Sequence, residues 1–560
     1  MSHHSPVYDL ADAFVSEYAA ADPAWATAVG VRGHDHEMTD FGPDAVEQRV
    51  ALVQRTLATL RALPRDTDRD RVAAAVMEER LDTELALHDA AEDLRDIRVI
   101  ASPIQEVRSC FDLMAYDTED DWSVAAQRLA AVPHALASLR ERFEAGRRRG
   151  LLAARRQVDA CAEQCATWGG EHGEDQPFFV QLVDDHERRF GESALHRTLV
   201  VHARAATDGY AAFARYLRDE YAPDAVAADA VGAERYALNA RAYCGAELDL
   251  VDTYQWGWDE LGRIETSMRA CADRIVPGGS IAEAADHLER DPARAIEGVD
   301  EFRAWNQDLI DETIAQLHGT HFDIPEPVRT CQAMIAPPGG AAAMYYTSPS
   351  EDFSRPGRTW YPTLGHTRFP LWREVSTCYH EAAPGHHLQI AQVVYLADVL
   401  SRFQRTSFVS GHGEGWALYA ERLMGELGYL DDPAYELGML AAQAMRAVRV
   451  IVDIGMHLEL AIPGDADYQP GERWTPELAL PFVIERSRQP ADFMRSEVDR
   501  YLGWPGQAIS YKVGERVWLE ARADARARHG ADFDLAAFHS YALDLGSMGL
   551  DPLRTELARF

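Results

Sequence analysis

The chain has 560 residues, of which 47% are hydrophobic and 26% charged, so its composition is that of a globular protein and excludes disorder as its main character. Its 55 lysines and arginines stand against 91 aspartates and glutamates, a formal net charge of −36. A protein this acidic repels phosphate backbones and anionic lipids, so we expect no nucleic acid and no membrane surface among its partners.

The N-terminal segment MSHHSPVYDLADAF has neither a basic start nor an apolar stretch, so we expect no secretory signal. The seven cysteines are scattered and form no CxxC pair, which disfavours a disulfide framework and a thiolate zinc site. The apolar run nearest to a membrane span, VVYLADVL at 393–400, is too short and contains an aspartate. We therefore expect a cytoplasmic protein.

From residue 8 to about 320 the chain is rich in Ala, Leu, Arg and Glu. Segments 70–94 and 124–150 repeat apolar residues at spacings of three and four, which predicts amphipathic helices, and Gly150 is a natural end for the second. Residues 322–370 differ, because Pro, Gly, Ser and aromatic residues predominate there, and they predict a small irregular sheet or hairpin.

Helical patterns then resume to the C-terminus. Thr475, Pro476 and Glu477 form a typical helix start, with a capping residue, a proline and an acid in the first turn. The sequence contains no glycine-rich phosphate loop and no GxSxG motif. The predicted fold class is mostly α.

The segment 373–394, REVSTCYHEAAPGHHLQIAQVV, contains the most informative motif. His380 and Glu381 interrupt an apolar helical stripe, as at the opening of the zincin motif, where a second histidine one turn later completes a metal pair and the glutamate acts on water. Pro384 stands at the position of that second histidine, and the next histidines are His386 and His387.

An unbroken helix could not build a metal site from these residues. His386 would lie about 240° around the axis from His380, and His387 about 10 Å further along it, whereas zinc ligands lie about 2 Å from one ion. A break at Pro384–Gly385 would return His386 to the side of His380. The alternative is a helix that merely ends with a histidine pair near solvent.

A third ligand is expected 28 residues further on, in SGHGEGWALYAERL at 410–423. Ser410 and the glycines indicate a helix start, after which Glu414 and Glu421 share one face. Glu414 would be the ligand, and Glu421 would orient a ligand histidine by a hydrogen bond. Two glutamates on a helix are also common on a solvated face, and the preceding HE…GH segment favours the metal interpretation.

HEAAPGHHLQ followed by EGWALYAE resembles the bacterial family called domain of unknown function 885, whose hallmark is an HExxPGH box. The segments 345–357, 446–457 and 500–515 also look like blocks of that family, so the resemblance covers about 350–515 closely. Through the glycine–histidine step the motif is similar to the helical gluzincins of the carboxypeptidase Taq and angiotensin-converting-enzyme type.

This resemblance implies a mostly helical, two-lobed fold around a deep cleft. We expect an N-terminal helical lobe at 1–240 and a catalytic lobe with the metal site at 241–560, the two forming one continuous unit around the cleft. The resemblance also implies metal-dependent amide hydrolysis, with His386 as the favoured second ligand and His387 as the alternative.

Further polar residues are candidates for supporting roles. Arg446, Arg449, Asp453 and His457 follow one another at spacings of three or four, which predicts either a structural salt-bridge ladder or a face on which Arg449 or His457 meets the cleft. Arg355, in the Pro- and Gly-rich segment, could bind a substrate carboxylate in a bidentate way.

The stretch 501–512 adds Gln507, Tyr511 and Lys512 to the expected substrate site. A tyrosine hydroxyl suits the stabilisation of a developing oxyanion, and we assign this role to Tyr511. Lys512 is the single lysine of the chain. Because an ammonium differs from a guanidinium, we expect it to be a working cation in the cleft, with chance survival as the alternative.

The sequence therefore favours a zinc-dependent hydrolase that cleaves an amide bond in a small peptide or peptide-like molecule. His380, His386 and Glu414 would hold one Zn²⁺, with Mn²⁺ or Co²⁺ as alternatives, and Glu381 would be the general base and acid. Two other functions stay open: an amidohydrolase acting on a non-peptide biosynthetic intermediate, and a catalytically inactive helical binding protein.

Overall fold

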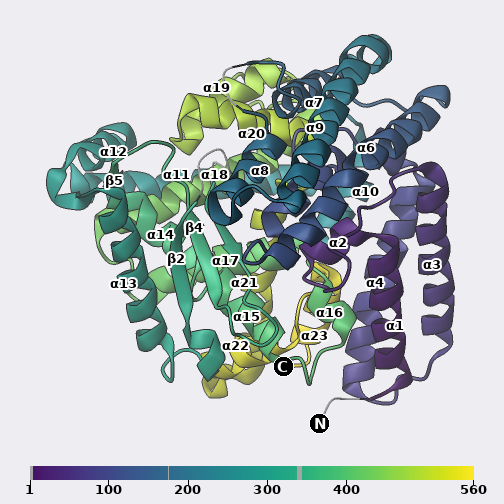
Figure 1. The fold of residues 1–560 in the computed structure, drawn as a ribbon. Coiled ribbons are helices and arrows are strands. Elements are labelled where there is room, and N and C mark those ends of the chain that lie inside the picture. Colours follow the sequence, from purple (N-terminus) through teal and green to yellow (C-terminus); the bar gives the residue numbers. More distant parts are fainter. Residues whose placement is uncertain (1–3, 174–175, 337–342) are drawn as a thin grey trace.

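The computed structural model describes residues 4–173, 176–336 and 343–560 and shows a mostly helical protein with a small sheet (Figure 1), which confirms the predicted fold class. The first three residues of the N-terminal segment and residues 337–342 of the expected sheet insertion lie outside the described residues. In the described part, no helix is long and apolar enough to cross a membrane.

The N-terminal part of the chain, before α11 (Leu250–Ile275), is helical. Its helices are α1 (Pro6–Ala21), α2 (Pro23–Ala28), α3 (Pro43–Ala62), α4 (Asp68–Asp89), α5 (Pro103–Ser109), α6 (Glu119–Arg148), α7 (Arg155–Trp168), α8 (Phe178–Phe190), α9 (Ala194–Arg215) and α10 (Ala233–Cys244). The central part has α11 (Leu250–Ile275), α12 (Ile281–Arg290), β1 (Ala295–Glu297), α13 (Val299–Leu317), β2 (Cys331–Ile335), β3 (Tyr345–Thr347), β4 (Gly357–Tyr361) and β5 (Arg368–Pro370).

The C-terminal part is again helical. It has α14 (Leu371–Glu381), α15 (His386–Tyr395), α16 (Arg402–Thr406), α17 (Ser410–Glu426), α18 (Pro433–Leu458), α19 (Pro476–Ser487), α20 (Ala491–Gly503), α21 (Ser510–His529), α22 (Leu535–Asp544) and α23 (Leu550–Leu557). Short 3₁₀ or π turns connect these elements: η1 (Glu92–Arg95), η2 (Cys110–Leu113), η3 (Tyr216–Tyr221), η4 (Ala222–Asp224), η5 (Pro292–Arg294), η6 (Glu326–Arg329) and η7 (Gly530–Asp532).

Local sequence signals set several helix starts. Thr67 and Thr118 each form a capping box with an aspartate three residues later, at the starts of α4 and α6. Thr475 caps α19 as expected, since its side chain accepts a hydrogen bond from Leu478 N and Pro476 occupies the first turn. The two helices predicted within 70–94 and 124–150 are therefore α4 and α6.

Buried apolar side chains form two large clusters. One cluster combines residues between 7 and 81 with residues between 236 and 557, and the other is built from Phe41 and residues between 97 and 222. Buried residues of α1, α3 and α4 therefore share a cluster with the C-terminal half. Amphipathic periodicity shows that a helix has an apolar face but not which core buries it.

The sheet insertion is confirmed and consists of two small pieces. β4 is central, pairing parallel with β2 and antiparallel with β3, while β5 pairs antiparallel with β1 from outside the predicted segment. No side chain fits at Gly357 in β4, because a Cβ there would lie 2.2 Å from Tyr346 Oη and 2.6 Å from His387 Nδ1. This glycine lets the sheet approach α15.

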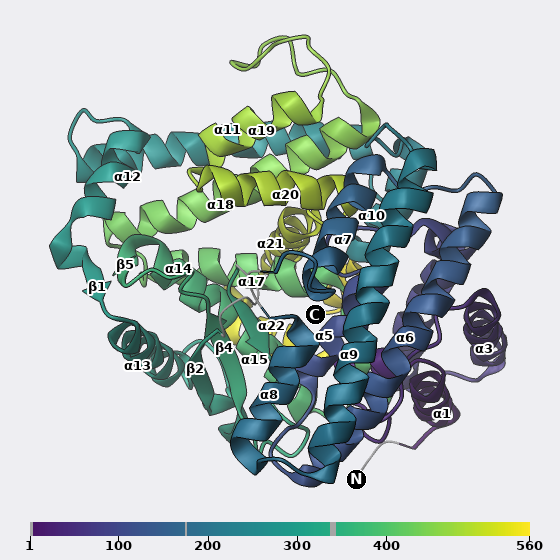
Figure 2. The same cartoon turned by 45° about the horizontal axis from the view of Figure 1, so that its top comes forward.

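The helix α18 organises the C-terminal half. It contacts α11 along one side and α14 and α17 along another, an arrangement visible in Figure 2. The helices α17 and α21 cross closely, because a Cβ on Gly415 would lie 2.5 Å from Gly514 Cα. The glycines of SGHGEG thus permit a close helix crossing as well as the helix start that the sequence predicts.

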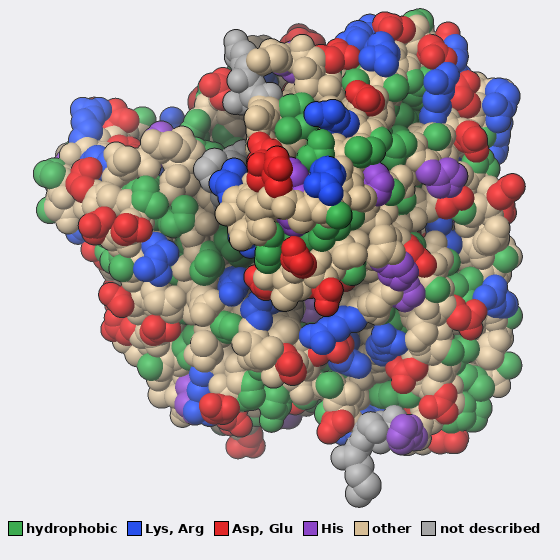
Figure 3. Space-filling view, viewed as in Figure 1, with side chains coloured by type: hydrophobic (Ala, Val, Ile, Leu, Met, Phe, Trp, Pro, Cys, Tyr) green, Lys and Arg blue, Asp and Glu red, His purple; other side chains and the backbone are tan. Residues whose placement is uncertain are grey.

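Acidic and basic side chains are interspersed on the face seen in Figure 3, with apolar side chains between them. The excess of negative charge is therefore distributed rather than gathered into one patch on this face.

Candidate metal centre

The helix break expected at Pro384–Gly385 is present between α14 and α15. α14 ends at Glu381 and α15 begins at His386. A Cβ on Gly385 would lie 2.0 Å from the His380 carbonyl oxygen, so glycine is required by contact with the preceding turn. Trp416 on α17 donates from Nε1 to Pro384 O at 2.8 Å. This bond ties the break to the helix that carries the third predicted ligand.

The break brings His380 and His386 next to Glu414. Glu414 Oε2 lies 3.4 Å from His380 Nε2 and 3.5 Å from His386 Nε2. The three side chains form the one group of potential metal ligands found among the described residues, with ligand atoms within 4.8 Å of one another.

The spacing of these atoms fits a zinc ion. Ligands at about 2.0–2.2 Å from zinc in a tetrahedron lie about 3.3–3.6 Å apart, which matches the two separations between Glu414 Oε2 and the histidine nitrogens. Glu414 Oε2 is buried and has no hydrogen-bond partner within the described part of the chain, although it faces two imidazoles. A buried polar atom without a partner is costly, so the donor set suits an ion that all three side chains can bind.

His380 is held by the glutamate that the sequence assigned to this role. His380 Nδ1 donates to Glu421 Oε1 at 2.7 Å, and Ser376 donates to Glu421 Oε2. The bond leaves Nε2 of His380 directed at the metal position.

The pKa values of His380 and Glu414 reflect the charged groups around them. Burial lowers the pKa of His380, but the Glu414 and Glu421 carboxylates outweigh it and raise this pKa to about 9. Burial alone would raise the pKa of Glu414, whereas His386 and His380 hold it well below its usual range. The centre thus attracts positive charge, and a divalent cation would take the place of the imidazole protons.

His387, the alternative ligand, is engaged elsewhere. Its Nε2 bonds to Val328 O at 2.8 Å and its Nδ1 to Tyr346 Oη at 3.0 Å. Burial lowers the pKa of His387 to about 4. The two adjacent histidines therefore divide their roles, His386 facing the carboxylate and His387 joining α15 to the sheet.

The three side chains open into a cavity of about 740 Å³. Glu381 lines this cavity beside them, and no described residue hydrogen-bonds its carboxylate. Burial raises the pKa of Glu381 above its ordinary value, against the opposing effect of His386 and His380. A carboxylate with a raised pKa, free of partners and beside a metal position, is suited to proton transfer.

Two other predicted residues reach the same cavity, Tyr511 and Arg449. The Arg449 guanidinium lies 4.6 Å from the centre of the Tyr511 ring. It also binds Glu497 at 2.7 Å and Tyr501 Oη at 3.0 Å, while its Nη1 has no hydrogen-bond partner in the described chain. Burial and the Glu414 carboxylate raise the pKa of Tyr511, so its phenol remains a donor.

Lys512 is placed away from the cavity, which corrects the expectation that it works in the cleft. Its ammonium is fully buried and binds Glu260 Oε1 at 2.8 Å, together with Glu515 and Gln443. Adjacent helix positions point about 100° apart, so Tyr511 faces the cavity while Lys512 faces α11 and α18. The lysine thus neutralises the carboxylate of Glu515, one turn along its own helix, and that of Glu260 from α11.

His457, Gln507 and Arg355 also lie outside the cavity lining. His457 is buried near the end of α18, with Nε2 bonded to Tyr501 O at 3.0 Å. Gln507 bonds to Arg500 and Ser410. Arg355 is exposed on the loop between β3 and β4. Of the two residues of 446–457 expected to meet the cleft, Arg449 therefore lines the cavity and His457 does not.

The cavity wall also contains residues to which sequence reasoning assigned no role in a site, among them Arg373, Glu374, Tyr345, Tyr346, Gln489 and Phe493. Arg446, which the sequence placed in the polar stripe with Arg449, lines the wall as well, since helical positions three apart share a face. Its guanidinium forms no ion pair with a described residue and its buried Nε has no partner there.

Comparisons with known proteins agree with the fold. The sequence pattern of a family described as "Bacterial protein of unknown function (DUF885)" matches residues 23–557. No curated protein matches the chain.

Among solved structures, a candidate lipoprotein from Colwellia psychrerythraea is similar with a TM-score of 0.85 and 23% identity, covering 99% of this chain and 98% of that one. A candidate lipoprotein of unknown function from Shewanella oneidensis has a TM-score of 0.74 and 17% identity, covering 99% of each chain. At these identities the likeness concerns the fold alone.

Proposed function

The chain belongs to the DUF885 family of bacterial proteins of unknown function, and we propose that it is a zinc-dependent hydrolase that cleaves an amide bond in a small peptide or peptide-like substrate. The observation that carries the proposal is the grouping of His380, His386 and Glu414, with Glu381 beside them in one cavity. We further propose that the centre is of the gluzincin type.

Each residue around the cavity has a defined task in this proposal. When bound by the two histidines and Glu414, zinc supplies a Lewis acid that polarises a carbonyl group and acidifies water. Glu381 takes a proton from the attacking water and delivers it to the leaving amine, so the products are a carboxylic acid and an amine. Tyr511 donates its hydroxyl hydrogen to the oxygen that becomes negative at the former carbonyl.

The arginines of the cavity indicate the charge of the substrate. Arg446 has no carboxylate partner among the described residues and Arg449 keeps Nη1 free, while both line the wall with the metal ligands. Guanidinium groups bind carboxylates with paired hydrogen bonds. We therefore propose that the substrate carries a carboxylate, such as the C-terminus of a short peptide.

Metal content and hydrolysis test the proposal together. Protein purified without chelators should contain one zinc per chain by elemental analysis, and His380→Ala and Glu414→Ala should lose it. Glu426→Gln, on the exposed side of the same helix as Glu414, is the matched control and should keep the metal. Absence of stoichiometric metal from the wild type would refute the proposal, and manganese or cobalt would revise the ion.

Activity should then be measured on dipeptides, tripeptides, their C-terminal amides and simple acyl amides, scored by released amine. Glu381→Gln should keep the metal and lose about 10²–10⁴-fold in turnover, the usual contribution of a general base. Cleavage of acyl amides alone would favour the non-peptide amidohydrolase. A zinc-loaded protein that cleaves none of the panel would favour a binding protein.

A further inference from the structure

A second cavity, of about 500 Å³, lies at the boundary between the two apolar cores. Its wall combines residues of α3, α4 and α10 with residues of α5, α6 and α7. None of the residues that line it lines the cavity of the metal centre. It is therefore a separate space within the described structure.

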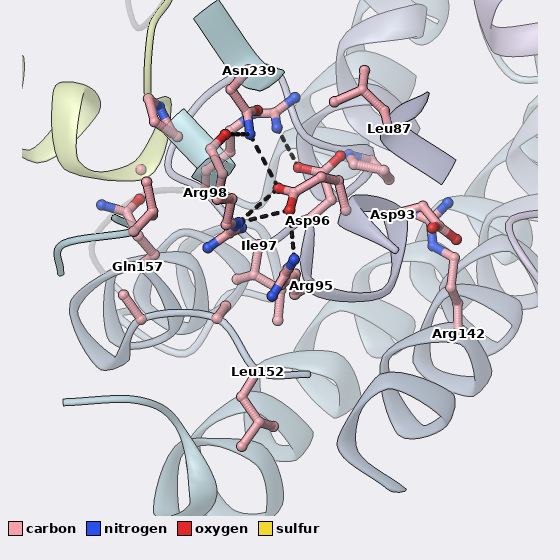
Figure 4. Close-up of a pocket in the computed structure, with 18 of the residues that line it drawn as sticks. Leu87, Asp93, Arg95, Asp96, Ile97, Arg98, Arg142, Leu152, Gln157 and Asn239 are labelled. Carbon is pink, nitrogen blue, oxygen red and sulfur yellow. Dashed lines mark hydrogen bonds and ion pairs between the residues drawn. The ribbon is translucent and has the colours of Figure 1, made fainter. Parts of the chain in front are cut away.

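One guanidinium in this cavity is buried without a hydrogen-bond or ion-pair partner among the described residues, although it lies over the rings of Phe41 and Phe143, at 5.7 and 5.8 Å from their centres. Arg142 on α6 is 5% exposed, and no described residue forms a hydrogen bond or ion pair with it. Its Nε and Nη2 atoms are both buried and unsatisfied. Figure 4 shows Arg142 reaching towards Asp93. Burial lowers the pKa of Arg142, which reflects the cost of a desolvated cation.

Two carboxyl groups of the same cavity have few protein partners, Glu84 half-buried and Glu106 exposed. Glu106 on α5 faces the cavity with no hydrogen bond or ion pair to any described residue, and Glu84 on α4 accepts a single hydrogen bond, from Tyr18 Oη at 3.1 Å. Burial raises the pKa of Glu84 to about 7.

Other charges in the wall are already satisfied by one another. Glu92 accepts from Arg95 at 2.6 Å, from Arg235 at 2.7 Å and from Asn239 at 3.4 Å. The dashed lines in Figure 4 show Arg95 and Asn239 within this network. The groups left over are thus one cation, Arg142, and two carboxyl groups, Glu84 and Glu106.

We propose that this cavity binds a small zwitterion with an apolar side chain, of the size of a free α-amino acid or a dipeptide. Arg142 supplies the donors that a carboxylate needs, and the carboxyl groups of Glu84 and Glu106 accept from an ammonium group. The apolar wall, including Phe41, Leu87 and Leu152, accommodates the side chain. The volume lies within the usual range for small-molecule sites, about 300–1,000 Å³.

Calorimetric titration of the whole protein tests this site, with L-leucine and L-leucyl-L-leucine as probes. N-acetyl-L-leucine lacks the ammonium group and 3-methylbutylamine lacks the carboxylate, and both should bind at least about 10-fold more weakly. Failure of both zwitterions to bind the wild type would overturn the proposal, as would equal binding of all four probes.

Two variants of residues that line the cavity test which groups bind the two charges of the ligand. Arg142→Gln should weaken zwitterion binding by at least about 10-fold, the usual effect of losing a charge-assisted hydrogen bond. Glu106→Gln should do the same, and because Glu106 has no partner in the described chain this variant should fold normally even if Arg142→Gln does not. Arg148→Gln, at the exposed end of α6, is the matched control and should bind as the wild type does.

The metal centre offers a rival location for a carboxylate, and Glu414→Ala separates the two. Zwitterion binding that survives Glu414→Ala but is weakened by Glu106→Gln supports the second cavity. Binding that is lost in Glu414→Ala and unchanged in Glu106→Gln would overturn the proposal. The outcome does not depend on hydrolytic activity, so it is distinct from the test of the proposed function.

Discussion

Replacing Glu421 by glutamine is the sharpest test of how the metal centre is held in place. Glu421 is 1% exposed and accepts from His380 Nδ1 at 2.7 Å, while Ser376 donates to its other oxygen. Glutamine keeps the size of the side chain but removes the negative charge that stabilises the imidazole. It also replaces one acceptor oxygen with an amide nitrogen, so His380 keeps its bond only if that nitrogen faces Ser376, whose hydroxyl can accept.

The magnitude follows from the role of such partners. Loss of the hydrogen-bonding partner of a metal-binding histidine typically costs 10–100-fold in metal affinity, or about 1.4–2.7 kcal/mol. We therefore expect the zinc dissociation constant of Glu421→Gln to rise by about 10–100-fold, with little change in the helical content of the protein.

Competition against a chromophoric chelator at fixed pH measures this constant. Glu426→Gln is the matched control, because Glu426 lies on the same helix but is exposed and pairs with Arg522, and its zinc affinity should equal that of the wild type. A dissociation constant for Glu421→Gln within twofold of the wild type would refute the reasoning, since His380 would then be oriented by packing alone.

Three further substitutions probe neighbouring features. Gly385→Ala should lower both zinc affinity and the melting temperature, because its Cβ would collide with the carbonyl oxygen of the preceding turn. Overpacking of this kind costs about 1–3 kcal/mol. Gly425→Ala, with space around its Cβ, is the control whose stability should not fall. Lys512→Met should lower the free energy of unfolding by about 1.5–3 kcal/mol, since Glu260 and Glu515 lose one buried charged partner but keep Arg263 and Arg422; a kinetic defect at unchanged stability in urea would instead restore a role in the cleft. Burial raises the pKa of Asp453 to about 7, so the folded state keeps a proton that the unfolded chain releases near pH 4. The free energy of unfolding of the wild type therefore decreases as the pH rises from about 4 to about 7. Asp453→Asn cannot ionise and should gain up to about 4 kcal/mol relative to the wild type between pH 4 and pH 8, whereas a pH-independent difference in unfolding free energy would contradict the assignment.

Local patterns were sufficient for several features of the metal centre. One continuous helix cannot bring His380 and a later histidine to the same metal ion. This predicts the break that separates α14 from α15. The spacing of Glu414 and Glu421 on one helix predicts their shared face, and His380 contacts both. These inferences succeeded because they concern backbone geometry within a few turns, where helix parameters are nearly constant.

The choice between adjacent histidines required the tertiary structure. His386 faces Glu414, while the sheet and the Val328 carbonyl occupy both ring nitrogens of His387. The partners of His387 lie 41 and 59 residues away in the sequence. No local spacing encodes such distant contacts, so periodicity leaves both histidines as candidates.

What the sequence by itself determined about this protein is its helical character, its sheet insertion, its helix break and the residue types of the centre. What only the tertiary structure decided is which core buries each helix and which charges meet across helices. Lys512 illustrates the limit, since its burial against Glu260, 252 positions earlier in the chain, turns an expected cleft cation into a structural one. The physical reason is that secondary structure follows from local sterics and hydrogen bonds, whereas the environment of a charge depends on whichever distant elements pack around it.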